Sequence, residues 1–258
     1  MKDYALITGA SKGIGKSVAC LLAQKNYNLL LIARSETGLG QLAENIKAEY
    51  GVDVLYLVLD LSVSGAAQQA SEWCKSLKVP ICVLVNNAGY GLWGDFELSE
   101  ISEQLNMLSL NINTVVELTY YLLPILKNNQ QSYILNVSST AAYQAIPTFS
   151  VYAASKAFVL SFSRALHYEL KNTPVSVSCV SPGPTDTSFA HRAGLDAIAD
   201  LAEKFNMSPE TVARIALREM FLKKTEIVPG LLNRLSSFAA RHMPRILVER
   251  ISANLYKH

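Results

Sequence analysis

The chain has 258 residues, of which 50% are hydrophobic and 17% are charged, and its formal net charge is +2 at pH 7. This length favours one large α/β domain over two separate ones, and the balanced charge gives no indication of nucleic-acid binding. The four cysteines are scattered, without C-x-x-C spacing or a histidine at ligand spacing. We therefore expect no metal site and a reduced, cytoplasmic protein. No apolar run approaches the roughly 18 residues of a membrane-spanning helix.

Seven short, apolar, β-rich segments recur along the chain and are separated by stretches of helical length. In chain order they cover residues 4–9, 28–33, 52–60, 81–86, 132–138, 175–180 and, more weakly, 225–229. Continuous apolarity is typical of strands that are buried on both faces. The sequence therefore predicts an α/β, doubly wound (Rossmann) fold, with a mostly parallel seven-stranded sheet and helices on both faces, formed by residues 1–258 as a single domain.

The first predicted strand runs directly into "TGASKGIG", residues 8–15. Glycines here let the backbone approach a pyrophosphate, which would lie at the N-terminus of the following helix. Three glycines can also form a plain tight turn, and their spacing departs from G-x-G-x-x-G. Their position between a first strand and a first helix is what favours a nucleotide.

The second predicted strand ends in Ala33 and Arg34, where an NAD site usually has an acidic residue for the ribose 2′-hydroxyl. Lys12 adds another cation in the glycine loop. Two cations without a carboxylate favour the 2′-phosphate of NADP(H), although both could also be solvated surface groups.

The later predicted strands also end in small, polar or charged residues, as expected where ligands bind outside the carboxyl ends of a parallel sheet. The third ends in Asp60 and Leu61, the fourth in "NNAG" at 86–89, and the fifth in Ser138 and Ser139. The sixth is followed by "SPGPTDT" at 181–187.

Four motifs in this order resemble those of the short-chain dehydrogenase/reductase family: "TGASKGIG", "NNAG", a serine thirteen residues before "YAASK", and "PGPTDT". The resemblance runs from about residue 4 to residue 190. The stretch "YGLWGDFE" at 90–97 and the basic tail resemble a bacterial oxidoreductase branch of the family.

The resemblance implies a catalytic set of Asn111, Ser139, Tyr152 and Lys156. Tyr152 would protonate a substrate carbonyl, or act as the base in reverse, and Lys156 would bind the nicotinamide ribose and lower the pKa of Tyr152. Ser139 would hold the substrate oxygen, and Asn111 would position a water. The chemistry agrees, because hydride transfer builds negative charge on oxygen, and side chains four residues apart share a helix face. Taken singly, the Tyr–Lys pair could be a solvated helix face and Asn111 a helix cap.

The implied cofactor is NADP(H), bound along the carboxyl ends of the strands. Its predicted contacts are Gly9, Ser11, Lys12, Gly13, Ile14, Gly15, Arg34, Asp60, Leu61, Asn87, Ala88, Gly89, Tyr152, Lys156, Pro182, Gly183, Thr185 and Thr187.

Aromatic residues follow several of the strand-end motifs and are candidate walls of a substrate pocket. With Ser139, the predicted substrate contacts are Tyr90, Trp93, Tyr143, Phe149 and Phe189. They favour an apolar carbonyl compound or alcohol, or an acyl chain, although each could be a core aromatic instead. Residues 187–206 are expected to form a substrate lid.

Two predicted helices, at 110–127 and 151–170, are apolar nearly all round and are therefore expected to be buried on all sides. In the resembled family the corresponding helices commonly form a subunit interface, which predicts a homodimer or homotetramer.

The tail, residues 231–258, combines apolar residues at helical spacing with five Arg and Lys residues. Such a basic amphipathic helix can lie on an anionic membrane surface, or pack over a neighbouring subunit or the substrate mouth. The leading hypothesis is an NADPH-dependent carbonyl reductase. The alternatives are an NADP(H)-binding regulatory protein with little turnover and a membrane-recruited protein on the same fold.

Overall fold

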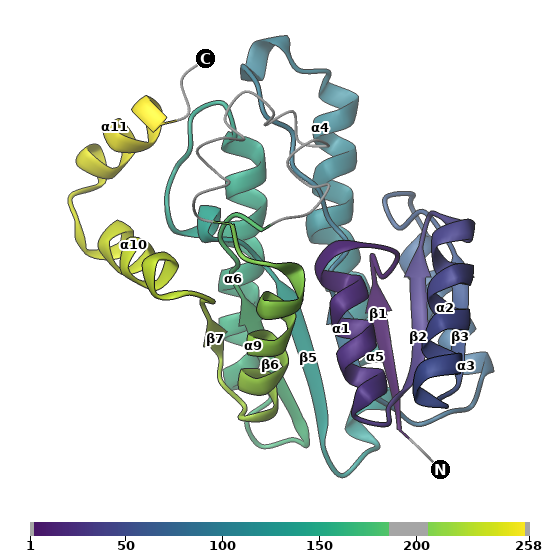
Figure 1. Ribbon diagram of the computed structural model, residues 1–258. Coiled ribbons are helices and arrows are strands. Elements are labelled where there is room, and N and C mark those ends of the chain that lie inside the picture. The colour runs from purple at the N-terminus through teal and green to yellow at the C-terminus, as the bar shows by residue number, and fades with distance from the viewer. Residues whose placement is uncertain (1–2, 186–205, 256–258) are drawn as a thin grey trace.

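The structure, a computed structural model, describes residues 3–185 and 206–255. Its strands form one parallel sheet in the order β3-β2-β1-β4-β5-β6-β7 (Figure 1). The strands are β1 (Tyr4–Thr8), β2 (Asn28–Ala33), β3 (Val54–Val58), β4 (Ile81–Asn86), β5 (Ser132–Val137), β6 (Val175–Val180) and β7 (Glu226–Ile227). The predicted doubly wound seven-stranded sheet is confirmed. The order reverses between β1 and β4, which is where such sheets bind ligands.

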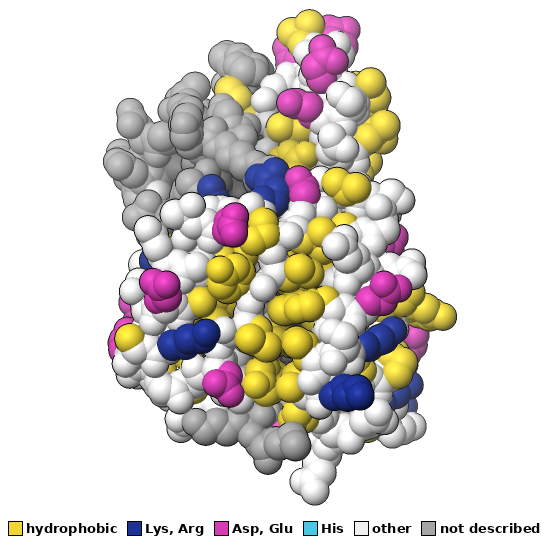
Figure 2. All heavy atoms as spheres, turned by 90° about the vertical axis from the view of Figure 1, so that its right-hand side faces the viewer, with side chains coloured by type: hydrophobic (Ala, Val, Ile, Leu, Met, Phe, Trp, Pro, Cys, Tyr) yellow, Lys and Arg dark blue, Asp and Glu magenta, His cyan; other side chains and the backbone are white. Residues whose placement is uncertain are grey.

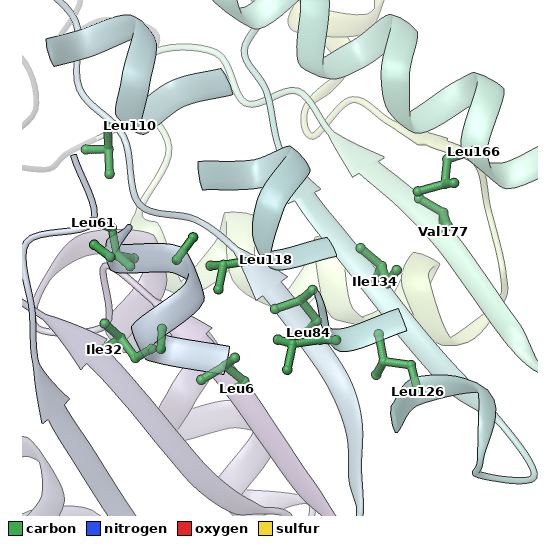
Figure 3. Close-up of a cluster of buried hydrophobic side chains, with 14 of the residues drawn as sticks. Leu6, Ile32, Leu61, Leu84, Leu110, Leu118, Leu126, Ile134, Leu166 and Val177 are labelled. Carbon is green, nitrogen blue, oxygen red and sulfur yellow. The ribbon is translucent and has the colours of Figure 1, made fainter. Parts of the chain in front are cut away.

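Helices cover both faces of the sheet and enclose two apolar cores. One face carries α1 (Gly13–Gln24), α2 (Glu36–Tyr50) and α9 (Pro209–Phe221), and the other carries α3 (Ala66–Ser76), α5 (Thr114–Lys127) and α6 (Ser150–Glu169). Successive strand residues alternate between the cores, so that Leu6 and Leu84 face α5 while Ile7 and Val85 face α1. Figure 3 shows the core on the α5 side, where Leu84, Leu118 and Ile134 lie together.

The edge strand β3 departs from the prediction that all strands are buried on both faces. Leu55, Tyr56 and Val58 remain 39%, 40% and 41% exposed. Figure 2 shows hydrophobic side chains gathered in the middle of the side of the molecule that carries this edge. The prediction was wrong here because apolar sequence does not distinguish an edge strand from a central one.

A π-helical turn interrupts the long helical segment between β4 and β5. After a short 3-10 turn, η1 (Phe96–Leu98), α4 (Ile101–Leu108) passes through η2 (Ser109–Asn113) into α5. The Thr114 hydroxyl donates to Leu61 O at 2.7 Å, and the Ser109 hydroxyl donates to Ser62 O at 2.8 Å. These bonds tie the π-helical turn to the loop after β3. The helix predicted at 110–127 is divided between η2 and α5, and the helical segment that contains it begins at Ile101.

The two helices predicted to be buried on all sides are instead partly exposed in the single chain. Tyr120 of α5 is 73% exposed and Tyr168 of α6 is 71% exposed. Their other sides pack on the sheet, so each helix has one buried and one open side.

The chain ends in two further helices, α10 (Leu231–His242) and α11 (Arg245–Leu255), separated at Pro244. Both lie beyond β7, at the opposite end of the molecule from β3 (Figure 1). Within residues 3–185 and 206–255, no helix combines the length and apolarity needed to cross a membrane. The predicted lid at 187–206, apart from Asn206, falls outside the described residues, as do Thr187 and Phe189.

Candidate active site

The glycine loop after β1 adopts a conformation that suits a pyrophosphate. Gly9 and Gly13 have φ of +64° and +57°, which other residues rarely adopt. A Cβ atom added to Gly15 would lie 2.4 Å from the carbonyl oxygen of Gly9. α1 begins at Gly13 without a side-chain cap or an acidic residue in its first turn. Its first N–H groups therefore remain available to an anion, and this end of the sheet fits the phosphates of a dinucleotide.

Thr8 and Asn87 hold this loop against the end of β4. The Thr8 hydroxyl accepts hydrogen bonds from the backbone N–H groups of Asn87 and Ala88, both at 3.0 Å. The Asn87 amide donates to the carbonyl oxygens of Thr8 at 2.9 Å and Gly9 at 3.2 Å. Asn87, predicted to line the cofactor, thus shapes the loop through its side chain. Sequence reasoning missed Thr8, whose only signal is a buried hydroxyl at the end of the first strand.

The end of β2 gathers cations and hydroxyl groups. Arg34 is 54% exposed at its side chain and lies 3.6 Å from the Asp60 carboxylate. Burial by itself would raise the pKa of Asp60, but hydrogen bonds from Ser62 and the nearby Arg34 outweigh it and lower that pKa. Arg34 therefore does have a carboxylate beside it, contributed by the end of β3 rather than β2.

The first turn of α2 completes this group. Ser35 caps the helix, its hydroxyl accepting from Gly38 N at 3.2 Å. A Cβ atom added to Gly38 would lie 3.3 Å from the Cβ of Ser11. Ser11 and Ser35 thus lie close together, with Lys12 exposed in the adjacent loop. Ser35 was missed from the sequence, although a serine just before a helical run is a recognisable cap signal.

Tyr152 and Lys156 lie one turn apart on the inner face of α6, only 5% and 4% exposed. The Lys156 Nζ is 5.7 Å from the centre of the Tyr152 ring and donates to Val137 O at 3.0 Å. Burial lowers the pKa of Lys156 to about 8. The ammonium is therefore desolvated rather than part of a solvated helix face, while still mostly protonated at neutral pH.

Hydrogen bonds to the backbone fix this stretch of α6. The Ser138 hydroxyl donates to Lys156 O at 2.7 Å, which ties the helix to the end of β5. The Ser155 hydroxyl donates to Tyr152 O at 2.7 Å. Ala154 and Phe158, on the other side of this helix, are exposed.

Asn111 lies in the π-helical turn and faces the same place as Lys156. Its amide donates to Tyr90 O at 2.9 Å and to the Ser155 hydroxyl at 3.0 Å, and its Oδ1 accepts from Tyr90 N at 3.2 Å. A Cβ atom added to Gly89 would lie 2.8 Å from Asn111 Oδ1 and 3.3 Å from Lys156 Nζ. Asn111 is inside a continuous helix, so its interpretation as a helix cap is wrong. π-helical turns of this kind are frequent at functional sites.

Ser139 follows β5 and opens the 3-10 turn η3 (Thr140–Tyr143). It is half-buried, and its hydroxyl accepts from Ala141 N at 3.1 Å. A hydroxyl that accepts this bond still has a proton to donate to a substrate oxygen.

Three of the predicted pocket walls lie with Tyr152 in one apolar cluster. Tyr90 and Phe149 are buried in this core, which extends along the whole face of the sheet, and the half-buried Trp93 packs against it. The ring of Phe149 stacks on that of Tyr152, with 4.3 Å between their centres. An apolar surface therefore lies directly beside the phenol.

Tyr143 does not join them. It packs with Val159, Leu160 and Cys179, and its hydroxyl donates to the Glu226 carboxylate at 2.6 Å. Burial and this hydrogen bond raise the pKa of Tyr143. The hydroxyl is thus committed to β7, away from the predicted pocket.

The loop after β6 is held from two sides. Thr140 N donates to Pro182 O at 2.8 Å, and the Thr185 hydroxyl donates to Gly183 O at 3.0 Å. A Cβ atom added to Gly183 would lie 2.3 Å from Oδ1 of Asn233, in α10. Asn233, which sequence reasoning missed, presses on a predicted cofactor contact from fifty residues further along the chain.

The chain is similar to known proteins in sequence and in fold. A model of the short chain dehydrogenase family matches residues 3–197. The chain is 30% identical over 262 residues to 17-beta-hydroxysteroid dehydrogenase type 3 of Mus musculus, covering 100% of this chain and 85% of that protein. It is 31% identical over 229 residues to the ketoacyl reductase HetN of a Nostoc strain, covering 86% of this chain and 77% of that protein.

A solved structure, the short-chain dehydrogenase of Sphingobium yanoikuyae in complex with NADPH, superposes with a TM-score of 0.83 at 30% identity, over 92% of each chain. The chain therefore belongs to the short-chain dehydrogenase/reductase family. It is an oxidoreductase on a Rossmann-type nucleotide-binding fold.

Proposed function

We propose that this protein is an NADP(H)-dependent carbonyl reductase. It transfers a hydride between the nicotinamide and an apolar carbonyl compound or secondary alcohol, of ketone, aldehyde or 3-oxoacyl type. The observation that carries this proposal is the buried pair of Tyr152 and Lys156 on one face of α6, next to Asn111 and Gly89.

The chemistry divides between the cofactor and the chain. The nicotinamide, when bound, supplies the hydride. Tyr152 donates a proton to the carbonyl oxygen as negative charge develops there, and the Ser139 hydroxyl donates a hydrogen bond to the same oxygen. Lys156 stabilises the phenolate that remains on Tyr152, because its pKa of about 8 leaves it mostly charged at neutral pH. Asn111 holds the backbone of Tyr90 and the Ser155 hydroxyl in place around this pair.

The preference for NADP(H) is supported by the group at the end of β2. Arg34 and Lys12 are exposed cations, and Ser11 and Ser35 lie beside the N-terminus of α2. Arg34 can turn from Asp60 to a 2′-phosphate, since Asp60 keeps its hydrogen bonds from Ser62. The related Sphingobium dehydrogenase was solved with NADPH.

An apolar substrate is supported by Phe149, which stacks on Tyr152, and by Tyr90 and Trp93, which belong to the same apolar core. The names of two relatives, a hydroxysteroid dehydrogenase and a ketoacyl reductase, agree with a carbonyl or alcohol substrate. We place the reaction in the cytoplasm, which the four free cysteines support.

The test compares the wild-type protein with Tyr152→Phe on a panel of ketones, aldehydes and 3-oxoacyl thioesters, with NADPH oxidation as the readout. Loss of the proton donor should lower kcat by about 10²- to 10⁴-fold. NADPH affinity, measured by fluorescence titration, should stay within about threefold, since only one hydroxyl is removed. Tyr168→Phe, on the exposed side of the same helix, is the matched control and should leave both quantities unchanged.

Equal turnover by the wild type and Tyr152→Phe would contradict the catalytic role. If the wild-type protein bound NADPH tightly but turned over no compound in either direction, the alternative of an NADP(H)-binding regulatory protein would replace the reductase.

A further inference from the structure

The helix α10 turns its polar side toward the protein. Asn233 lies against Gly183, and its amide donates to Pro229 O at 2.8 Å. Ser237 is 5% exposed. Arg241 pairs with Glu226 of β7, and its guanidinium lies 4.5 Å from the centre of the Tyr143 ring. Polar contacts thus anchor α10 beside β7 and η3.

The opposite side of α10 is apolar and faces outward. At 100° per residue, Leu231, Leu235 and Phe238 lie on one side and Asn233, Ser237 and Arg241 on the other. The exposed side chains continue into α11. We call this set the apolar tail face: Leu231, Leu232, Leu235, Phe238, Ile246, Leu247 and Ile251, with exposures of 70%, 63%, 57%, 62%, 67%, 45% and 46%. A helix that packs only on its own chain would bury these residues and expose the polar ones.

The segment that carries the apolar tail face has an excess of positive charge. Residues 231–255 contain four arginines, Arg234, Arg241, Arg245 and Arg250, and one carboxylate, Glu249, which gives a net charge of +3. Arg241 is paired with Glu226, whereas Arg234, Arg245 and Arg250 are exposed. Exposed apolar side chains and exposed arginines on the same two helices match the two layers of an anionic bilayer surface, its acyl boundary and its phosphates.

We propose that α10 and α11 dock on the surface of a membrane that contains anionic lipids. The apolar tail face enters the headgroup region, and Arg234, Arg245 and Arg250 contact lipid phosphates. A second copy of the chain fits less well, because a two-fold contact would bring the same arginines of both copies together without carboxylates to pair them. This docking stands independently of the proposed reaction.

The experiment is flotation of the full-length protein with vesicles of phosphatidylcholine alone or mixed equally with phosphatidylglycerol. Binding to the mixed vesicles should greatly exceed binding to the neutral ones and should weaken as salt is added. Leu232→Glu should lower binding at least about tenfold, since it places a carboxylate at the apolar boundary next to anionic lipid. The matched control is Leu222→Glu, at the end of α9. Leu222 is 62% exposed and Leu232 is 63% exposed, and the control should bind like the wild type.

A second variant tests the charges without altering the apolar residues. Arg245→Gln together with Arg250→Gln should weaken binding to the mixed vesicles by about fivefold for each arginine removed. The melting temperature and the NADPH affinity should be unchanged in every variant, and these two measurements check that each variant is folded.

Three results would overturn the proposal. The first is that the wild type binds neither kind of vesicle, which would mean that the chain itself covers the face. In the second, Leu232→Glu and the arginine variant float like the wild type. The third is a dimer, seen by sedimentation velocity, that Leu232→Glu dissociates, since the occupant would then be a second copy.

Discussion

At the residue scale, the buried Lys156 of the candidate site lowers the stability of the folded chain. The residue is 4% exposed, and its ammonium donates a hydrogen bond to the backbone carbonyl of Val137. Burial lowers its pKa to about 8, whereas an unfolded lysine titrates at about 10.4. Between these values the unfolded chain binds more protons, so this residue's destabilisation is fully present below pH 8 and declines as the pH rises toward 10.4.

Lys156→Met should therefore stabilise the nucleotide-free protein at pH 7. The pKa difference corresponds to about 3 kcal/mol, and the unpaired Val137 carbonyl offsets about 1 kcal/mol, which leaves a gain of about 2 kcal/mol in the free energy of unfolding. The gain should shrink between about pH 8 and pH 10. Urea unfolding at several pH values measures it, with the exposed Lys127→Met as control. A gain that does not change with pH would show that packing, rather than the buried charge, is responsible.

Two neighbouring asparagines at the end of β4 have different roles, one in the core and one at the candidate site. Asn86 donates to Asn136 Oδ1 at 2.8 Å within the core, while Asn87 donates to the backbone of the glycine loop. Strand alternation sends the two side chains in different directions. The motif "NNAG" predicted a polar strand end, but the alternation determined which asparagine reaches the nucleotide loop.

At the scale of elements, three segments contribute to the proposed 2′-phosphate site: the glycine loop, the end of β2 and the first turn of α2. Arg34 and Lys12 were identified from the sequence because the strand ends where an acidic residue usually stands. Asp60 could not be assigned to this group, since only the pairing of β3 with β2 brings it beside Arg34, whereas Ser35 directly follows Arg34 and carries a recognisable cap signal.

Arg34→Asp combined with Lys12→Ala should reverse part of the cofactor preference. Losing two cations opposite a phosphate should raise the KM for NADPH by about 10²- to 10⁴-fold, since hydrogen bonds between charged groups contribute about 1.5–3 kcal/mol each and two are lost. The KM for NADH should change little. Lys47→Asp with Lys127→Ala makes the same change in net charge on exposed residues elsewhere. An unchanged ratio of the two KM values in the first variant would refute the 2′-phosphate site.

At the scale of the whole molecule, the open sides of α5 and α6 remain without a partner within the described chain. Tyr120, Phe158 and Tyr168 are 73%, 41% and 71% exposed, and Phe158 stacks on Phe162 with 6.0 Å between ring centres. Large exposed aromatics on neighbouring helices are typical of protein interfaces. This agrees with the expected subunit interface.

We expect a homodimer or homotetramer in solution, assembled through α5 and α6. Tyr120→Glu together with Phe158→Glu should give a monomer, since the carboxylates would be buried without partners. Light scattering coupled to size-exclusion chromatography measures the mass, with Leu222→Glu as the control at an exposed leucine of α9's end. A wild-type monomer, or a double variant that keeps the oligomeric mass, would contradict this interface.

The sequence by itself determined the seven strands, the glycine loop and the Tyr152–Lys156 pair. Apolar runs, glycines between a strand and a helix, and i,i+4 spacing are local signals that survive without a structure. Only the tertiary structure decided that Tyr143 turns to Glu226, that Asn233 presses on Gly183, and that α10 faces its leucines outward. The physical reason is that an amphipathic pattern states that a helix has two faces, but not which of them the rest of the molecule will cover.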